Sequence, residues 1–161
     1  MDDQERGARD EQSAASRRRR RTGRPAQYFR RRTRPGAGRR GGGAVIQFVS
    51  YGIKNGPPPA FDVLIDCLDL PDPSPVVLDT PGTTAEVAEV ILGANPLVQS
   101  WLQVVTALVL ERMKTDGSFT VAFACSAGWH RSPFAAEHVA AMLRAAGVEV
   151  AVCHRDLEVI G

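Results

Sequence analysis

The segment from Cys125 to Ser132 combines residue types that suit the binding of an anion. It contains Cys-Ser-Ala-Gly-Trp-His-Arg-Ser. The β-branched and aromatic residues 118–124 precede it and predict a buried strand. Pro133 and the residues after it predict a helix, with Ser132 as its N-cap and Pro133 in its first turn. A strand-to-helix loop directs backbone N–H groups and the positive end of the helix dipole towards one point.

Arg131 would add a planar set of N–H donors that matches the oxygens of a phosphate group. The loop therefore predicts a phosphate site, and the expected ligand is a phosphorylated small molecule. The candidate ligand-binding residues of the loop are Cys125, Ser126, Ala127, Gly128, His130, Arg131 and Ser132.

The charge of the chain is divided between two regions. Residues 1–43 contain 14 arginines and five acidic residues, a net charge of +9, whereas residues 44–161 contain six basic and 13 acidic residues, a net charge of −7. The first region has almost no apolar residues, so it cannot bury enough surface to offset its chain entropy. We therefore expect a disordered, Arg-rich arm over residues 1–43 and one folded domain over residues 44–161.

The arm is a candidate for binding RNA, because its positive charge would attract phosphates and its two adjacent aromatic residues could stack on bases. A solubilising tail, or a start codon placed too far upstream, is the alternative explanation. The RNA-binding candidates form one uninterrupted run: Arg17, Arg18, Arg19, Arg20 and Arg21.

The three cysteines fit a reducing compartment, and their spacing contains no Cys-x-x-Cys pair that would indicate structural zinc. We expect no metal and no cofactor, with Cys67 and Cys153 packed in the core. The chain has no apolar run of transmembrane length and no apolar segment typical of a secretory signal. The sequence therefore predicts a cytoplasmic protein that has no contact with a membrane.

The periodicity of apolar residues predicts alternating strands and helices. This order predicts a single-domain α/β fold with a mostly parallel sheet of about four strands flanked by helices. Thr83 or Thr84 should cap the first helix, and Gly147 should end the third. The long second helix should bury Leu97, Trp101, Val104, Val105, Leu108 and Met113. The expected strands are residues 44–50, 61–68, 119–124 and 148–153, and the expected helices are residues 83–92, 96–113 and 133–146.

Several polar residues follow the expected strands. Tyr51, Lys54, Asp66 and residues 154–156 each lie near the carboxyl end of a strand, as the loop from Cys125 does. Ligands of open parallel sheets bind at those ends. We therefore add Lys54, Asp66, His154 and Arg155 to the candidate ligand site.

Four segments resemble, in order and spacing, the C-terminal domain of the RapZ/YvcJ family. Residues 50–58 resemble its FGYKYGxP opening, and residues 66–73 resemble its DxRxLPNP segment. Residues 124–132 resemble its GCTGGxHRS loop, and residues 154–157 match its terminal HRDL. The resemblance implies a domain that binds glucosamine-6-phosphate and a small RNA, within a full-length protein that acts as an RNase adaptor and carries a P-loop nucleotide-binding half.

The chain departs from that family pattern at several positions. It contains no G-x-x-x-x-G-K-[ST] sequence, which the nucleotide-binding half would need. Leu68 stands where the family has Arg, Ser74 where it has His, and Asp79 where it often has Arg. These departures do not touch the loop, so phosphate binding there is the implication of the resemblance that they affect least. The negative charge of residues 44–161 disfavours RNA binding by that region.

A cysteine-dependent phosphatase is the alternative. Cys125 and Arg131 have the spacing of the C-x5-R-[ST] phosphatase signature, in which a thiolate attacks phosphorus while Arg and backbone amides hold the oxygens. Ala124 occupies the usual His position of that signature, and Asp66, Asp69 or Asp72 would have to supply the general acid. This alternative does not explain the other three segments. The single most useful measurement is a thermal-shift panel of phosphosugars, nucleotides and free phosphate.

Overall fold

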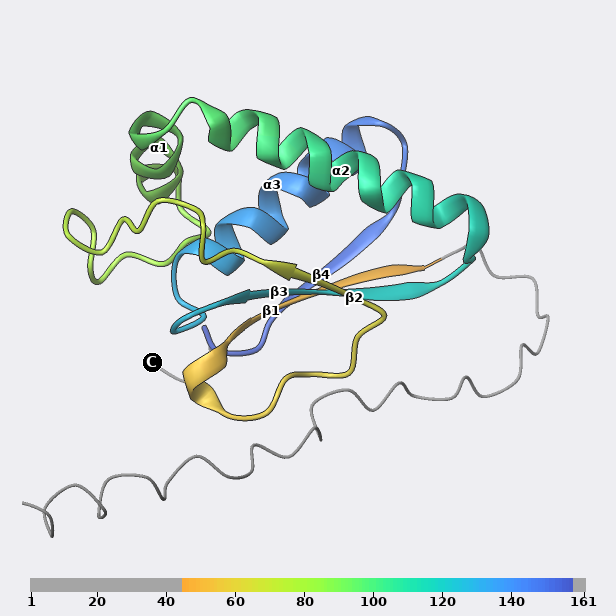
Figure 1. Ribbon diagram of the computed structural model, residues 1–161, viewed down its shortest axis with the longest axis horizontal. Helices are drawn as coiled ribbons and strands as arrows, with labels where there is room; N and C mark the ends of the chain where they lie inside the picture. The colour runs from red at the N-terminus through yellow and green to blue at the C-terminus, as the bar shows by residue number, and fades with distance from the viewer. Residues whose placement is uncertain (1–44, 158–161) are drawn as a thin grey trace, which may run out of the picture. The chain divides into compact units, whose positions relative to one another are not determined.

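The computed structural model describes residues 45–157, which form a four-stranded sheet and three α-helices (Figure 1). The expected arm, and Ala44 at the expected start of the first strand, lie outside the described residues. The elements in chain order are β1 (Ile46–Gly52), the short 3-10 helix η1 (Ile53–Asn55), β2 (Val63–Asp66), α1 (Ala85–Ala94), α2 (Leu97–Thr115), β3 (Phe119–Cys125), α3 (Arg131–Ala145) and β4 (Val150–His154).

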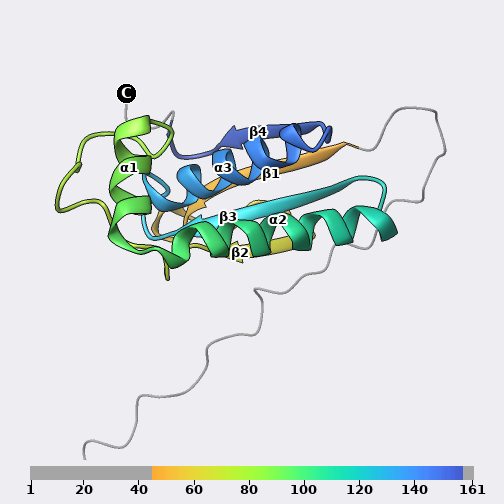
Figure 2. The same cartoon turned by 90° about the horizontal axis from the view of Figure 1, so that it is seen from above.

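The sheet is entirely parallel, which confirms the predicted α/β fold class. Its strand order is β2-β3-β1-β4, so β3 and β1 are central (Figure 2). Ile46 pairs with Phe119 of β3 and with Val150 of β4. The parallel arrangement brings the carboxyl ends of all four strands to one edge of the sheet, where the polar residues were expected to meet.

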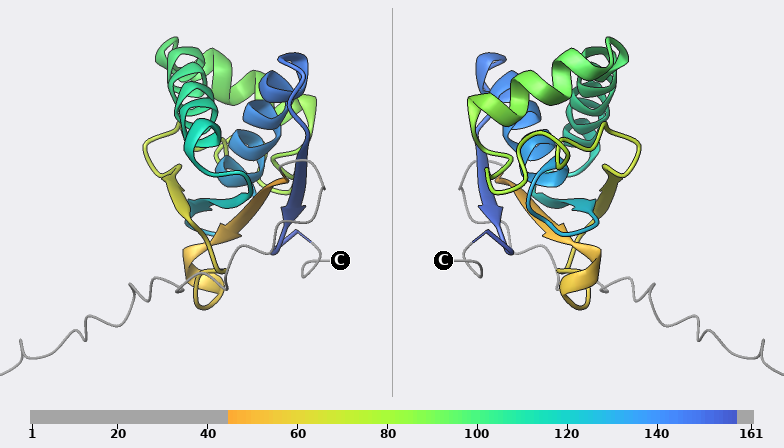
Figure 3. Two further views of the ribbon diagram at one scale, coloured as in Figure 1. Left: turned by 90° about the vertical axis from the view of Figure 1, so that its right-hand side faces the viewer. Right: turned by 90° about the vertical axis from the view of Figure 1, so that its left-hand side faces the viewer.

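The helices cover one face of the sheet and the β1–β2 connection (residues 53–62) covers part of the other (Figures 1 and 3). The handedness of the crossovers explains this. The steps from β2 to β3 and from β3 to β4 move in the same direction across the sheet, so right-handed crossovers place their helices on one face. The step from β1 to β2 moves in the opposite direction, and its connection crosses on the other face.

The main core lies between the sheet and the helices. Phe48 and Phe123 of the central strands are fully buried there, with ring centroids 5.0 Å apart, and Phe134 of α3 is also fully buried. On the other face, Phe61 of the β1–β2 connection packs against Tyr51 and two alanines of β3. The central strands are therefore apolar on both sides, as parallel strands usually are.

The predicted core face of the helix at residues 96–113 was partly wrong. Leu97, Val104 and Leu108 are exposed, whereas α2 buries Val98, Leu102, Val105, Thr106 and Val109. Trp101 and Met113 are partly buried against the core. Two adjacent helical faces of α2 carry apolar residues, so periodicity alone could not decide which one faces the sheet.

Core packing was predicted for two cysteines, and it is confirmed for Cys67, which is fully buried, and wrong for Cys153. Cys153 is exposed because β4 is an edge strand and its side chain lies on the face that has no helices. An apolar run does not reveal whether its strand lies at the edge or in the centre of a sheet.

The expected helix ends were confirmed at two of three positions. The Thr84 hydroxyl accepts a hydrogen bond from Val87 N at the start of α1, and Gly147, with φ +81°, ends α3 while Val148 N donates to Leu143 O. Ser132 is not an N-cap, because α3 already begins at Arg131 and the Ser132 side chain points elsewhere. No helix among residues 45–157 is long and apolar enough to cross a membrane.

Candidate functional site

The β3–α3 loop (residues 126–130) lies at the carboxyl edge of the sheet, between the last residue of β3 and the first residue of α3. The segment after β1 holds it from one side. Lys54 N donates to Ser126 O over 3.1 Å, and Asn55 Nδ2 donates to Ala127 O over 2.8 Å. Lys54 therefore meets the loop through its backbone, and its side chain is exposed.

Two glycines allow the end of β1 to touch the loop. A Cβ on Gly52 would lie 2.3 Å from the carbonyl carbon of Ala127, and a Cβ on Gly128 would lie 2.6 Å from Gly52 N. Gly128 also has φ +75°, which side-chain-bearing residues rarely adopt. Glycine at both positions is therefore required for the close contact.

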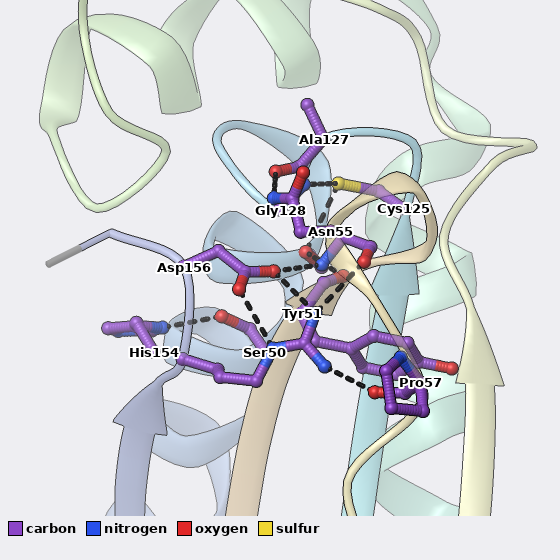
Figure 4. A network of polar contacts seen from close by, with 12 residues as sticks. Ser50, Tyr51, Asn55, Pro57, Cys125, Ala127, Gly128, His154 and Asp156 are labelled. Atoms are coloured by element: carbon purple, nitrogen blue, oxygen red, sulfur yellow. Dashed lines mark hydrogen bonds and ion pairs between the residues drawn. The ribbon is translucent and has the colours of Figure 1, made fainter. Parts of the chain in front are cut away.

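The sulfur of Cys125 lies beside two hydrogen-bond donors, one from the loop and one from the start of α3 (Figure 4). Gly128 N donates to it over 3.2 Å, and the Ser132 hydroxyl lies 3.1 Å away. The same hydroxyl lies 3.2 Å from Tyr51 O, so Ser132 joins the ends of β1 and β3. Ser132 was predicted to cap the helix, but its hydroxyl instead holds the two strand ends on either side of the loop together.

Asp156 supports the loop from the β4 side. Its buried carboxylate accepts a hydrogen bond from Gly52 N over 2.5 Å and two from Arg155, from Nε over 2.8 Å and from Nη2 over 2.9 Å. Burial alone would raise the pKa of Asp156, but these hydrogen bonds outweigh burial and hold that pKa below its usual value. Asp156 is therefore a buried anion whose donors tie β1 to the segment after β4.

Arg155 is fixed within the chain by every nitrogen of its guanidinium. Besides Asp156, Nη1 donates to Pro57 O over 2.7 Å and Nη2 donates to Gly52 O over 3.0 Å. The guanidinium also lies over the Tyr51 ring, 5.0 Å from its centroid. Burial raises the pKa of Tyr51, Arg155 opposes that rise, and the nearby charge of Asp66 adds to it.

His154 belongs to a separate polar chain beside the loop (Figure 4). Its Nδ1 lies 2.8 Å from the fully buried Ser50 hydroxyl, and its Nε2 lies 3.1 Å from a carboxylate oxygen of Glu137 on α3. A carboxylate can only accept a hydrogen bond, so Nε2 carries a proton and donates it to the hydrogen bond with Glu137. This chain links β1, β4 and α3.

The β2–α1 connection (residues 67–84) closes the loop from the other side. Gly82 N donates to Trp129 O over 2.8 Å, and a Cβ on Gly82 would lie only 1.9 Å from His130 O. The buried His130 ring places Nε2 3.0 Å from Val77 O and Nδ1 3.4 Å from the Ser74 hydroxyl. A carbonyl can only accept, so Nε2 carries a proton.

Arg131 is held by the same connection, but less completely than Arg155. Its Nη1 donates to Leu68 O over 2.9 Å, and its Nη2 lies 3.7 Å from a carboxylate oxygen of Asp72. The side chain of Arg131 is 12% exposed and that of Asp72 is 52% exposed. Hydrogen bonds from Ser74 hold the pKa of Asp72 below its usual value, with help from the charge of Arg131.

The structure thus brings together the loop residues from Cys125 to Ser132, the backbone of Lys54, and the segment containing His154 and Arg155. Asp66 is exposed at the end of β2, and its carboxylate accepts a hydrogen bond from Leu68 N. Among residues 45–157, no three His, Cys, Asp or Glu side chains are grouped closely enough to hold a metal ion.

Several residues of this site were not among the ligand-binding candidates, although Asp156 was placed at a strand end and Asp72 was considered as a general acid. Asp72, Ser74 and Gly82 come from a Pro-rich segment whose path across the loop has no sequence signal. Asp156 lies next to His154 and Arg155 at the carboxyl end of β4, and this position was a usable signal, because ligands of parallel sheets bind at such ends. The added residues are Gly52, Asn55, Asp72, Ser74, Gly82 and Asp156.

Known proteins resemble this part of the chain. A nucleotide-binding protein of Thermobifida fusca is 36% identical over 115 residues, which are 68% of this chain and 39% of that protein. One of Corynebacterium jeikeium is 36% identical over 120 residues, 70% of this chain and 41% of the relative, and one of Thermus thermophilus is 35% identical over 123 residues, 73% and 44%. The chain thus spans about two fifths of the length of each of these relatives.

The family model described as the RapZ C-terminal domain matches residues 44–158. The matched region includes all four strands, the β3–α3 loop and the residues from His154 to Asp156. The chain therefore belongs to the family of the RapZ C-terminal domain.

Proposed function

We propose that this domain binds a phosphorylated small molecule, of the phosphosugar class, at the β3–α3 loop. The observation that carries the proposal is the position of Arg131, the first residue of the 15-residue helix α3 at the end of a central strand. The positive end of the helix dipole and a guanidinium meet there, and both favour a phosphate. The family resemblance supports a phosphosugar as the ligand.

Arg131 and Arg155 suit different tasks. Arg155 has all its nitrogens bound within the chain, which suits a positioning role. Arg131 has one close hydrogen bond and one longer ion pair to an exposed carboxylate. A phosphate carries more negative charge than a carboxylate and would displace Asp72 from the guanidinium.

Ligand-induced thermal stabilisation tests the proposal. Glucosamine-6-phosphate and inorganic phosphate should raise the melting temperature of the full chain as their concentration rises, because they bind only the folded state. Arg131→Ala should weaken binding more than tenfold, since charged hydrogen bonds contribute about 1.5–3 kcal/mol. Arg131→Lys should also bind weakly, because an ammonium lacks the planar set of donors.

Lys114→Ala is the matched control, because it removes a positive charge from an exposed pair with Glu111, away from the loop. Its affinity should equal that of the wild type. Adenine nucleotides belong in the same titration, since the relatives are named nucleotide-binding proteins. Equal affinity in Arg131→Ala and Lys114→Ala would remove the loop from the proposed site.

A cysteine-dependent phosphatase is the second candidate, and the two donors at the Cys125 sulfur favour it. Two observations oppose it: Ala124 stands where the phosphatase signature has His, and the other three family-like segments have no role in it. Hydrolysis of p-nitrophenyl phosphate that disappears in Cys125→Ser but persists in Cys153→Ser would favour the enzyme over the binding domain.

RNA binding by the arm is a separate proposal. Arg17 to Arg21 lie outside the described residues, so it is supported by charge alone, +9 in residues 1–43 against −7 in residues 44–161. Phosphates attract the first region and repel the second.

A further inference from the structure

Cys67 and Cys125 stand opposite each other at the ends of neighbouring parallel strands. The register pairs Ile65 with Phe123 and Asp66 with Ala124, so the next pair in the series is Cys67 with Cys125. Cys67 N donates to Ala124 O over 2.8 Å, which continues the ladder past the end of β2. Side chains alternate along a strand, so both cysteines point towards the helices, and both belong to the main core.

This placement fits the geometry that a disulfide requires. Neighbouring strands lie about 4.8 Å apart, and the Cα atoms of a disulfide lie about 4.4–6.8 Å apart. Both thiols are free in this structure. The third cysteine, Cys153, is on β4 at the opposite edge of the sheet from β2, so it does not compete for either partner (Figure 2).

We propose that Cys67 and Cys125 form a modification site for peroxide, where disulfide formation disables the β3–α3 loop. The sulfur of Cys125 attacks one oxygen of hydrogen peroxide, so that an S–O bond forms and the O–O bond breaks. The departing hydroxide takes the proton of that thiol and leaves as water. The Cys125 sulfur, now a sulfenic acid, has been oxidised by two electrons and the peroxide reduced.

The sulfur of Cys67 completes the reaction. It attacks the Cys125 sulfur, an S–S bond forms, the S–O bond breaks, and the departing hydroxide takes the Cys67 proton to leave as a second water. Cys67 acts second because burial raises the pKa of its thiol well above the ordinary value, and the nearby Cys125 adds to that rise. Cys125 acts first because it is 3% exposed at the start of the loop, whereas Cys67 is 0% exposed.

The disulfide would change the loop directly. In the reduced protein the Cys125 sulfur accepts hydrogen bonds from Gly128 N and the Ser132 hydroxyl (Figure 4). Bonding to Cys67 turns the sulfur towards β2 and removes the acceptor that fixes Gly128. The expected loss of phosphate binding rests on the proposed function, whereas the formation of the disulfide does not.

Peptide mapping tests the bond itself. Trypsin separates the three cysteines, because Cys67 lies in the fragment of residues 55–112, Cys125 in residues 115–131 and Cys153 in residues 145–155. The full chain is treated with hydrogen peroxide, blocked with iodoacetamide and digested without reductant. We expect a linked pair of fragments 55–112 and 115–131 that dithiothreitol separates, in the wild type and in the control variant Cys153→Ser.

The same samples are titrated with inorganic phosphate in a thermal-shift assay. Peroxide should reduce the phosphate-induced stabilisation at least threefold, dithiothreitol should restore it, and Cys67→Ala should keep it. Cys125 recovered as an unlinked sulfinic acid, or linked to fragment 145–155, would overturn the modification site. If the disulfide between Cys67 and Cys125 forms and the phosphate-induced stabilisation does not change, the proposed effect of the disulfide on the loop is overturned. If phosphate does not stabilise the reduced protein, the proposed function is refuted. The peptide map would still show whether the disulfide forms.

Discussion

The guanidinium of Arg131 and the carboxylate of Asp72 lie 3.7 Å apart, although the two residues come from different connections of the sheet. The carboxylate is also fixed by the Ser74 hydroxyl over 2.5 Å and by Ser74 N over 3.1 Å. The domain thus supplies its own anion at the residue that we assign to a ligand phosphate. Asp72 and the ligand are expected to compete.

Asp72→Asn should therefore increase the affinity for phosphate. An ion pair of this length near the surface contributes at most about 1 kcal/mol, so the expected gain is roughly two- to fivefold. Isothermal titration with inorganic phosphate measures it. Asp79→Asn is the control, because it removes the same charge from an exposed position of the same connection. An equal gain in both variants would point to the overall charge of the domain and not to competition at Arg131.

Gly128→Ala should destabilise the fold by roughly 1–3 kcal/mol, because it places a methyl group 2.6 Å from Gly52 N at a φ of +75°. Gly93→Ala should have the opposite effect and stabilise the protein by about 0.5–1 kcal/mol. Gly93 lies within α1, has no atom near its expected Cβ, and would gain helix propensity. Urea denaturation of both variants measures the two changes, and a Gly128→Ala protein as stable as the wild type would contradict the close contact described here.

Asp156 predicts a specific dependence of stability on pH. Its folded pKa lies below the usual value of 3.8, so the carboxylate stabilises the fold at pH values above 3.8 and loses that contribution as pH falls through the lower folded pKa. Asp156→Asn should melt several degrees below the wild type at pH 7. The difference should shrink as pH falls below 4, because the wild type then loses its carboxylate as well. Melting temperatures between pH 2.5 and 7 measure this, and a constant difference would show that the charge of Asp156 has no role.

The arm should dominate any binding of RNA. Each phosphate of single-stranded RNA that it engages should add about −0.7 to the log–log slope of affinity against salt. Replacing all five residues from Arg17 to Arg21 with Ser should make that slope less steep by several units, whereas Arg131→Ala should leave it nearly unchanged. Fluorescence titration at several salt concentrations measures both. Equal affinity with and without residues 1–43 would assign RNA binding to the folded domain.

The local elements of the domain were predictable because their signals are local. Alternating apolar runs located all four strands within a few residues, and Thr84 and Gly147 marked helix ends through their own side-chain or backbone preferences. The loop from Cys125 was equally visible, since its residues are consecutive. The role of Ser132 was not predictable, because a serine near the start of a helix fits the N-cap pattern whether or not its side chain caps the helix.

The supports of the loop could not be predicted, because they come from distant segments. The hydrogen bond between Gly52 and Asp156 joins residues 104 positions apart, and the ion pair of Arg131 depends on the path of a Pro-rich connection. The buried face of α2 was predicted wrongly for a similar reason. The exposed residues Leu97, Val104 and Leu108 are as apolar as the buried Leu102 and Val105. Only the packing of α2 on the sheet distinguishes these two sets.

The central position of β1 affects how fast the chain can fold. Each residue of β1 pairs with a β3 residue 73 positions later, and residues 46–50 also pair with β4 residues 104 positions later. The hydrogen bonds of Val45 with Ser118 and of Gly52 with Asp156 have the same separations. The first strand therefore has no neighbour to pair with until most of the domain has been synthesised. Contacts of such long sequence separation slow folding relative to a helical bundle of similar size. During translation, the unpaired edges of β1 would remain open to association with other chains for that whole interval.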